Sequence, residues 1–180
     1  DDMIAGLRLP SAYPHPVVRI DHIETHISHV FLAGDYAYKI KKPVNLGFLD
    51  FSSPERRYFY CQEELRLNAR LAPHLYLEVV PVTGTSEAPR LGGEGKVLEY
   101  AVKMRRFDQT GLLSMRPLEG DLPERVAERV AAFHAAIPSI DEGQAFGTAE
   151  AVLVPMLANF EVIRSCSTDE AILERLVSLE

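Results

Sequence analysis

The sequence predicts an α+β fold, in which an antiparallel sheet of five strands is crossed by one helix and followed by further helices. Short apolar segments bounded by Gly, Pro, Asp and Ser recur through residues 18–107, as strands do. One helical pattern interrupts them between Pro54 and Pro73. After residue 107 the patterns are helical, so we place a sheet-containing part at 1–107 and the first helices of a helical part at 108–180.

The five expected strands lie at 18–26, 29–33, 36–42, 75–82 and 97–107. Residues 83–96 are rich in Gly, Ser, Pro and Thr and are predicted to form an exposed hairpin loop. Residues 45–50 link the third strand to the helix and contain Leu46, Phe48 and Leu49. We expect this apolar loop to be packed rather than to form a substrate surface.

The third strand, Tyr36 to Lys42, carries two lysines on one side. Alternate residues of a strand share a face, which places Ala37, Lys39 and Lys41 opposite the apolar residues between them. A small residue two places before a lysine fits a nucleotide site, because the base must lie close to the backbone while the cation reaches the phosphates. The alternative is a solvated edge strand, whose lysines discourage pairing with other chains.

The helix carries a carboxylate on its apolar stripe. Ser52 with Glu55 fits a capping box, and the stripe that follows consists of Tyr60, Glu64, Leu67 and Leu71. A carboxylate in a packed interface is costly unless a cation meets it. Lys39 is the candidate cation for Glu64. The alternative is a glutamate at a partly wet helix margin.

These residues carry a family resemblance. The motifs are ETHIS (Glu24–Ser28), YKIKKPV (Tyr38–Val44), GFLDFSSPERR (Gly47–Arg57) and EELRLNARLAP (Glu63–Pro73). They resemble the amino-terminal part of the aminoglycoside phosphotransferase-like family, and more narrowly its bacterial branch in which this module is often joined to a downstream P-loop domain. The resemblance covers nearly all of the chain and is strongest from Glu24 to Pro73. It implies a protein-kinase-like fold, ATP as the bound nucleotide, and a small-molecule hydroxyl as acceptor.

The resemblance also implies roles for individual residues. Lys39 matches the strand lysine that contacts the α- and β-phosphates, and Glu64 matches the helix glutamate that pairs with it, with Glu63 as the fallback if the register shifts by one. A turn over the phosphates would lack the Gly-rich form, and it would use its backbone N–H groups and the side chains of Thr25, His26 and Ser28. The hinge that bonds the adenine edge would contain Met104, Arg106 and Phe107.

Two parts of such an enzyme are missing from the sequence. A phosphotransferase needs a base for the acceptor hydroxyl and ligands for Mg²⁺, which the family carries on an H-G-D-x-x-x-x-N loop and a following Asp-containing strand. The four later aspartates lack the companion His-Gly and Asn; they are Asp108, Asp121, Asp141 and Asp169. We therefore expect an amino-terminal fragment that is inactive alone. One alternative is an inert kinase-like module that senses nucleotide or docks a partner domain. Another is a plain α+β interaction domain, in which Lys39 and Glu64 lie far apart and solvated.

The charge, hydrophobicity and cysteine content of the chain argue against several other classes of protein. The chain has 180 residues and a formal net charge of −7, which argues against a general nucleic-acid binder. No apolar run approaches the roughly 20 residues of a membrane helix. The two cysteines, Cys61 and Cys166, predict free thiols in a reducing cytoplasm, and the absence of clustered Cys and His predicts no zinc site.

Overall fold

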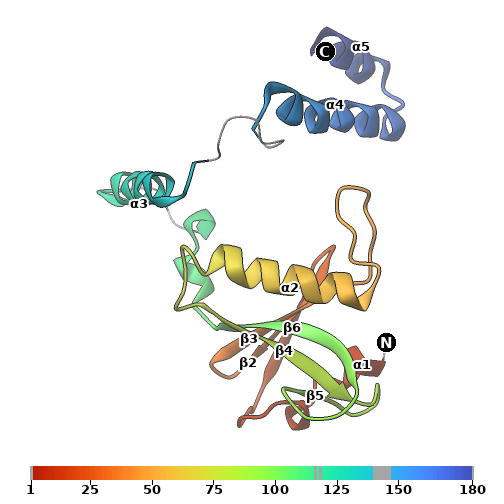
Figure 1. The fold of residues 1–180 in the computed structure, drawn as a ribbon, viewed down its shortest axis with the longest axis vertical. Helices are drawn as coiled ribbons and strands as arrows, with labels where there is room; N and C mark the ends of the chain where they lie inside the picture. Colours follow the sequence, from red (N-terminus) through yellow and green to blue (C-terminus); the bar gives the residue numbers. More distant parts are fainter. Residues whose placement is uncertain (1, 116, 118, 140–146, 180) are drawn as a thin grey trace. The chain divides into compact units, whose positions relative to one another are not determined.

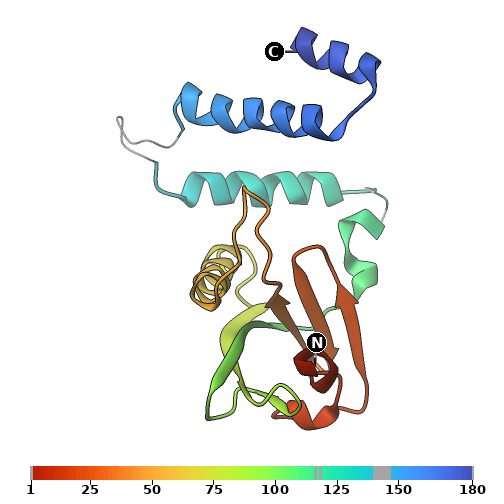
Figure 2. The ribbon, with the colours of Figure 1, turned by 90° about the vertical axis from the view of Figure 1, so that its right-hand side faces the viewer.

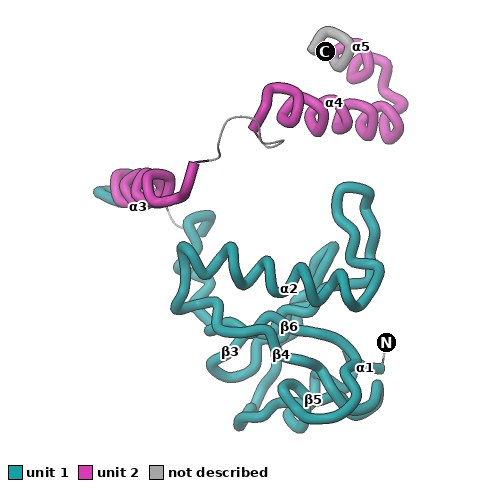
Figure 3. The backbone as a smooth tube through the Cα atoms, viewed as in Figure 1, with its two compact units in different colours: residues 1–123 teal, residues 124–180 magenta. Residues whose placement is uncertain are grey.

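The computed structural model describes residues 2–115, 117, 119–139 and 147–179. The chain forms two compact units, Asp1–Pro123 and Glu124–Glu180 (Figure 3). The boundary expected after residue 107 follows the end of the sheet, whereas the first unit continues through two 3-10 turns, η2 (Gln109–Gly111) and η3 (Leu113–Met115).

The first unit is built on one antiparallel sheet with strand order β1-β2-β3-β6-β4-β5. Its strands are β1 (Ile20–Glu24), β2 (Ser28–Ala33), β3 (Tyr36–Lys41), β4 (Tyr76–Gly84), β5 (Pro89–Leu91) and β6 (Val97–Arg105). The predicted α+β class is confirmed. β3 lies between β2 and β6, so its lysines do not belong to an edge strand, as one alternative had proposed.

The predicted number of strands was wrong, because the sheet has six. The additional strand, β5, lies inside the segment 83–96 that was expected to be an exposed loop, and it pairs with the end of β4. Two features explain it. Leu91 is 2% exposed and belongs to the core, so the segment has an apolar anchor. Gly84 has a φ of 96°, which favours glycine, and lets the chain turn back onto β4.

Helix α2 (Pro54–Asn68) lies across one face of the sheet (Figures 1 and 2). It begins one residue later than the predicted capping box. The Oγ of Ser53 accepts a hydrogen bond from the N–H of Arg56 at 3.3 Å, whereas Ser52 donates to Asp50. The helix therefore has an N-cap of the expected residue type at the neighbouring serine.

The face that α2 turns toward the sheet also differs from the predicted stripe. Leu67 and Leu71 are 40% and 43% exposed, whereas Arg57 and Cys61 are buried and share a face with Glu64. Spacings of four and three residues place those three side chains in one row. The sheet supplies a partner of opposite charge for each charged member of this row, Glu99 for Arg57 and the lysines of β3 for Glu64. Only Glu64 of the predicted stripe lies in it.

The opposite face of the sheet packs against the start of the chain. Helix α1 (Asp2–Gly6) and the 3-10 turn η1 (Pro10–Ala12) contribute to a core that includes residues of five strands. Its largest fully buried side chains are Tyr38, Phe31, Leu7, Ile40 and Val82. The Tyr13 hydroxyl donates to the carbonyl of Leu7 at 2.7 Å, and this bond joins the residue after η1 to the residue after α1. The apolar side of β3 is thus buried, as its alternation predicts.

The loop at residues 45–50 is not packed, contrary to prediction. An isolated bridge joins Asn45 to Asp50, and the N–H of Leu46 donates to the carbonyl of Leu49 at 2.8 Å. Two of its three apolar side chains point to solvent, since Leu46 is 48% exposed and Phe48 is 88% exposed.

Helices follow the sheet, as the sequence predicts: α3 (Leu122–Ala136), α4 (Ala149–Cys166) and α5 (Glu170–Leu179). The Oγ1 of Thr148 caps α4 by accepting from the N–H of Ala151 at 3.1 Å. Asp141 lies outside the described residues. Within the described ranges no helix combines the length and apolar character needed to cross a bilayer.

Candidate functional site

The two residues with the strongest predicted roles meet between β3 and α2. Lys39 Nζ lies 2.8 Å from Glu64 Oε1, and the two side chains are 29% and 11% exposed. The alternative of a plain interaction domain required them to be apart and solvated, which this contact contradicts. Glu63, the fallback, instead bonds to Arg66 three residues further along the helix.

Sequence reasoning missed a second cation on the same carboxylate. Lys41 Nζ lies 2.6 Å from Glu64 Oε2, and its side chain is only 5% exposed. Its ammonium group also sits 4.8 Å from the centre of the Phe51 ring, within the range of a cation–π interaction. The signal was present in the sequence, because strand alternation places Lys41 on the same face as Lys39.

We call Lys39, Lys41 and Glu64 the lysine–glutamate cluster. Burial raises the pKa of Glu64, whereas the hydrogen bonds and charges of the two lysines lower it. The lysines have the larger combined effect, so the pKa lies below its ordinary value. Two ammonium groups face one carboxylate, which leaves one net positive charge among these three side chains. Lys39 is the more accessible of the two cations.

Ala37 and Met104, two of the predicted nucleotide contacts, lie directly opposite each other on β3 and β6. Paired residues of adjacent strands share a face, and Ala37 shares its face with Lys39. Ala37 is 7% exposed. The structure therefore brings the small residue, the methionine and the lysine onto one side of the sheet.

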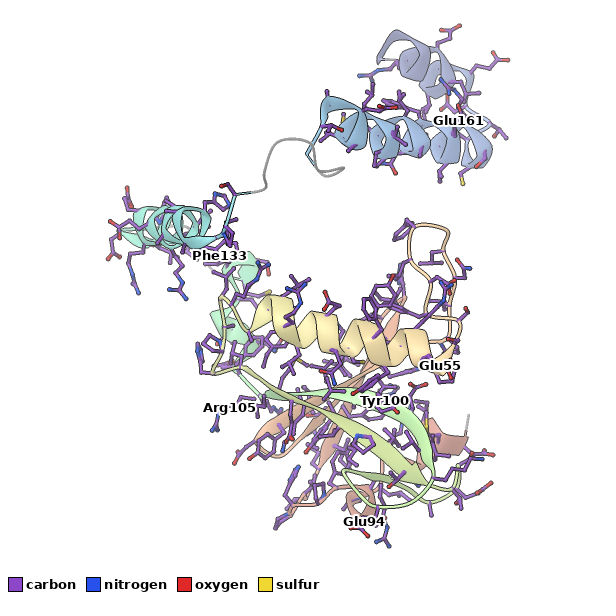
Figure 4. The ribbon with its side chains drawn as sticks, viewed as in Figure 1. Glu55, Glu94, Tyr100, Arg105, Phe133 and Glu161 are labelled. Atoms are coloured by element: carbon purple, nitrogen blue, oxygen red, sulfur yellow. The ribbon has the colours of Figure 1, made fainter. Side chains whose placement is uncertain are left out.

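The predicted hinge begins inside β6 with Met104, and the residues at and after the end of this strand line a pocket. Arg105, Arg106, Phe107 and Asp108 enclose about 320 Å³ together with the Gly34-Asp35 turn. Figure 4 labels Arg105 at the end of β6. The N–H of Arg106 donates to the carbonyl of Asp35 at 2.8 Å, so this donor is already used. Phe107 is 45% exposed.

The predicted phosphate turn joins β1 to β2, at the opposite end of β3 from the hinge. Thr25 Oγ1 accepts from the N–H of Ser28 at 2.9 Å, and the N–H of Thr25 donates to the carbonyl of Ser28 at 2.9 Å. His26 is exposed. Ser28 is fully buried opposite Lys41, and its Oγ has no hydrogen-bond partner among the described residues.

A second buried ion pair ties α2 to β6. Arg57 Nε lies 2.6 Å from Glu99 Oε2, and both side chains are less than 10% exposed. Arg57 also donates to the carbonyls of Phe51 and Ser52. Beside it, the rings of Tyr58 and Tyr100 lie 4.4 Å apart, and Figure 4 labels Tyr100 under α2. The helix that carries Glu64 is thus attached to the sheet at two points of its buried face, seven residues apart.

The candidate site offers no metal cage of its own. Within the described ranges, no three His, Cys, Asp or Glu residues lie close enough together to hold a metal ion. Cys61, one turn before Glu64 on the buried face, is a free thiol. Burial raises its pKa to about 11, so it remains protonated beside the cluster.

The chain is similar to three mycobacterial proteins. They are the uncharacterized protein Rv2004c of Mycobacterium tuberculosis (strain ATCC 25618 / H37Rv), the uncharacterized protein MT2060 of Mycobacterium tuberculosis (strain CDC 1551 / Oshkosh), and the uncharacterized protein Mb2027c of Mycobacterium bovis. Each is 42% identical over 128 residues, a match that covers 67% of this chain and 24% of the relative. The chain thus spans about a quarter of the length of these relatives. No family model and no solved structure matches it.

Proposed function

We propose that residues 1–107 form the nucleotide-binding half of an ATP-dependent phosphotransferase with a kinase-like fold, acting on a small-molecule hydroxyl. The observation that carries the proposal is the bond between Lys39 and Glu64, which joins a central strand to helix α2 across one face of the sheet. Five strands with the order β1-β2-β3-β6-β4 and the helix α2 agree with the lobe that the family resemblance implies. β5 is an addition at the edge.

The charge of the cluster supports a phosphate ligand. One net positive charge in a partly buried site favours an anion, because charges attract more strongly where solvent is excluded. Lys39 is exposed enough to reach a ligand while remaining beside Glu64. In this role Lys39 would bind the α- and β-phosphates, and Glu64 would orient Lys39.

The order of the other candidates along β3 supports the same ligand. The hinge residues lie beside the start of this strand, since Tyr36 pairs with Arg105, and the turn before Ser28 lies beside its end. Ala37 and Lys39 follow one another between these two ends. A base at the hinge and phosphates toward the turn would match this sequence of contacts. The base for the acceptor hydroxyl and the ligands for Mg²⁺ would come from other parts of the polypeptide.

A second candidate is an inert kinase-like module that senses nucleotide or docks a partner domain. The β1–β2 turn favours it, because the N–H groups of Thr25 and Ser28 are bonded within the turn instead of being presented to phosphates by a glycine-rich backbone. The two candidates differ in the sequence downstream of this chain. An H-G-D loop with its Asn supports the enzyme, and a downstream region without that loop supports the module.

Calorimetric titration of the full-length protein with MgATP tests the proposal. We expect saturable binding by the wild type and at least about tenfold weaker binding by Lys39→Ala, which corresponds to 1.4 kcal/mol or more. Lys103→Ala is the matched control. Lys103 also bonds to a glutamate, Glu78, at 2.8 Å, but it pairs with Tyr38 and so lies on the other face of the sheet. Equal affinities of the wild type and Lys39→Ala would remove the lysine from the site.

A further inference from the structure

The lysine–glutamate cluster contains one more cation than an orienting ion pair requires. Each oxygen of Glu64 has its own lysine, Oε1 that of Lys39 and Oε2 that of Lys41. The proposed function gives Lys39 a ligand to bind and gives Lys41 none. The contacts of Lys41 indicate its role.

The surroundings of Lys41 differ sharply from those of Lys39. The Lys41 side chain is 5% exposed, against 29% for Lys39. Phe51, itself 3% exposed, lies against its ammonium group, and the buried Ser28 lies opposite it on β2. Lys41 is enclosed on the protein side of the carboxylate, and Lys39 is on the accessible side.

We propose that Lys41 is a positioning residue, which holds Glu64 in place while Lys39, still beside the carboxylate, shares its ammonium group between Glu64 and a phosphate of the bound nucleotide. The inference rests on the proposed function and adds a residue to it. Its physical basis is the cost of a buried carboxylate without a cation. With a single lysine, a phosphate would have to compete for the only partner of Glu64. With two, Lys39 can turn some of its N–H groups toward a phosphate while Lys41 still compensates the charge of the carboxylate.

The attachment of α2 agrees with this division of labour. Arg57 binds Glu99 on β6, and Lys41 binds Glu64 seven residues later on the same face of the helix. Neither contact involves Lys39. The helix is therefore held against the sheet by contacts that binding of a phosphate to Lys39 leaves intact.

The first test measures the affinity of the full-length protein for MgATP. Lys41→Met is expected to weaken binding about tenfold although Lys39 is present, and Lys41→Arg is expected to restore much of the affinity because it keeps the charge. In a Glu64→Gln background, where no carboxylate needs a partner, Lys41→Met is expected to add less than about twofold. Lys103→Met, on the other face of the sheet, is the control and should bind as the wild type does.

Two results of that test would overturn the proposal. Wild-type affinity in a folded Lys41→Met protein would reduce Lys41 to a structural role. An equally large loss from Lys41→Met in the Glu64→Gln background would mean that Lys41 touches the ligand itself. The second comparison also serves if Lys41→Met alone does not fold, because the double variant has no unpaired carboxylate at this point.

The second test needs no nucleotide and separates this inference from the proposed function. Acetic anhydride acylates accessible amines, and mass spectrometry gives the rate at each lysine. In Lys41→Met the carboxylate is left to Lys39 alone, so we expect Lys39 to be acylated several-fold more slowly than in the wild type. An unchanged rate, with an intact near-ultraviolet spectrum, would refute the inference. If wild-type protein binds no MgATP, the proposed function fails, and this rate still decides the role of Lys41.

Discussion

Glu64 places a carboxylate between two ammonium groups, and this arrangement has a consequence for stability. Its pKa in the folded protein lies below the value of about 4.3 expected for an unfolded chain. A group with a lowered folded pKa contributes stability above its unfolded pKa and loses that contribution as the pH falls through its folded pKa. The cluster should therefore stabilise the first unit at neutral pH and cease to do so in acid.

The free energy of unfolding of the wild type should decrease as the pH is lowered below about 5. We predict a smaller decrease for Glu64→Gln, because this variant has no carboxylate to protonate at position 64. All seven tyrosines lie between residues 13 and 100 and the chain has no tryptophan, so tyrosine fluorescence during urea unfolding reports on the first unit. Glu63→Gln is the control, because its partner Arg66 is exposed and solvent screens this pair, which therefore contributes little to stability. If the free energy of unfolding depended on pH in the same way in the wild type and in Glu64→Gln, Glu64 would not be the source of the predicted loss of stability in acid.

Cys61 gives a second prediction for a single residue. Its thiol is fully buried and its pKa is about 11, whereas Cys166 is exposed. Since the thiolate is the reactive form, the native 180-residue chain at pH 8 should show one thiol that reacts rapidly with a disulfide reagent. Cys166→Ser should abolish the rapid reaction, and denaturant should restore one thiol. Rapid reaction of native Cys166→Ser would show that Cys61 is not buried between α2 and the sheet.

The residues of the cluster were predictable to different degrees. Lys39 and Glu64 stood out because a strand alternates and a charged residue on a helix stripe needs a partner. Lys41 was placed on the correct face, but its bond to Glu64 depends on the depth of the helix over the sheet, which sequence spacing does not define. Arg57 and Glu99 lie 42 positions apart, and no local pattern links them.

Helix α2 is held by polar contacts on the face where a helix usually buries apolar residues. This explains why its sheet-facing row was mispredicted: an apolar stripe favours Leu67 and Leu71, but the charges of the sheet draw Arg57 and Glu64 inward. Likewise β5 escaped prediction because a three-residue strand has no periodicity to detect. The longer strands were predictable because each alternates between turn signals.

The buried pair Arg57–Glu99 should stabilise the protein far more than the exposed pair Arg56–Asp50 does. Arg57→Met leaves a buried carboxylate without its cation, and we expect it to lower the free energy of unfolding by about 3–5 kcal/mol. Arg56→Met breaks an ion pair with Asp50 whose arginine is 56% exposed, so we expect a much smaller loss, because solvent screens an exposed pair. Urea titrations followed by tyrosine fluorescence compare the two. Equal losses would show that the buried pair does not anchor α2.

At the scale of the molecule, the described chain divides into a sheet-containing unit with a charged site and a unit of helices. The α+β class could be predicted because local patterns define strands and helices. The family resemblance supplied the expected roles for the site, and the geometry supplied the partner of each side chain. The chain spans about a quarter of the length of these mycobacterial relatives.

The most direct measurement of the central claim uses ATP whose terminal phosphate carries an acyl group. A lysine that lies against the bound phosphates attacks this group and becomes acylated, and peptide mass spectrometry identifies it. We predict acylation of Lys39, suppression of that acylation by excess MgATP, and no suppressible acylation of Lys103 on the other face of the sheet. Acylation of exposed lysines that ATP does not suppress, with Lys39 unmodified, would contradict the claim that this lysine binds nucleotide phosphates.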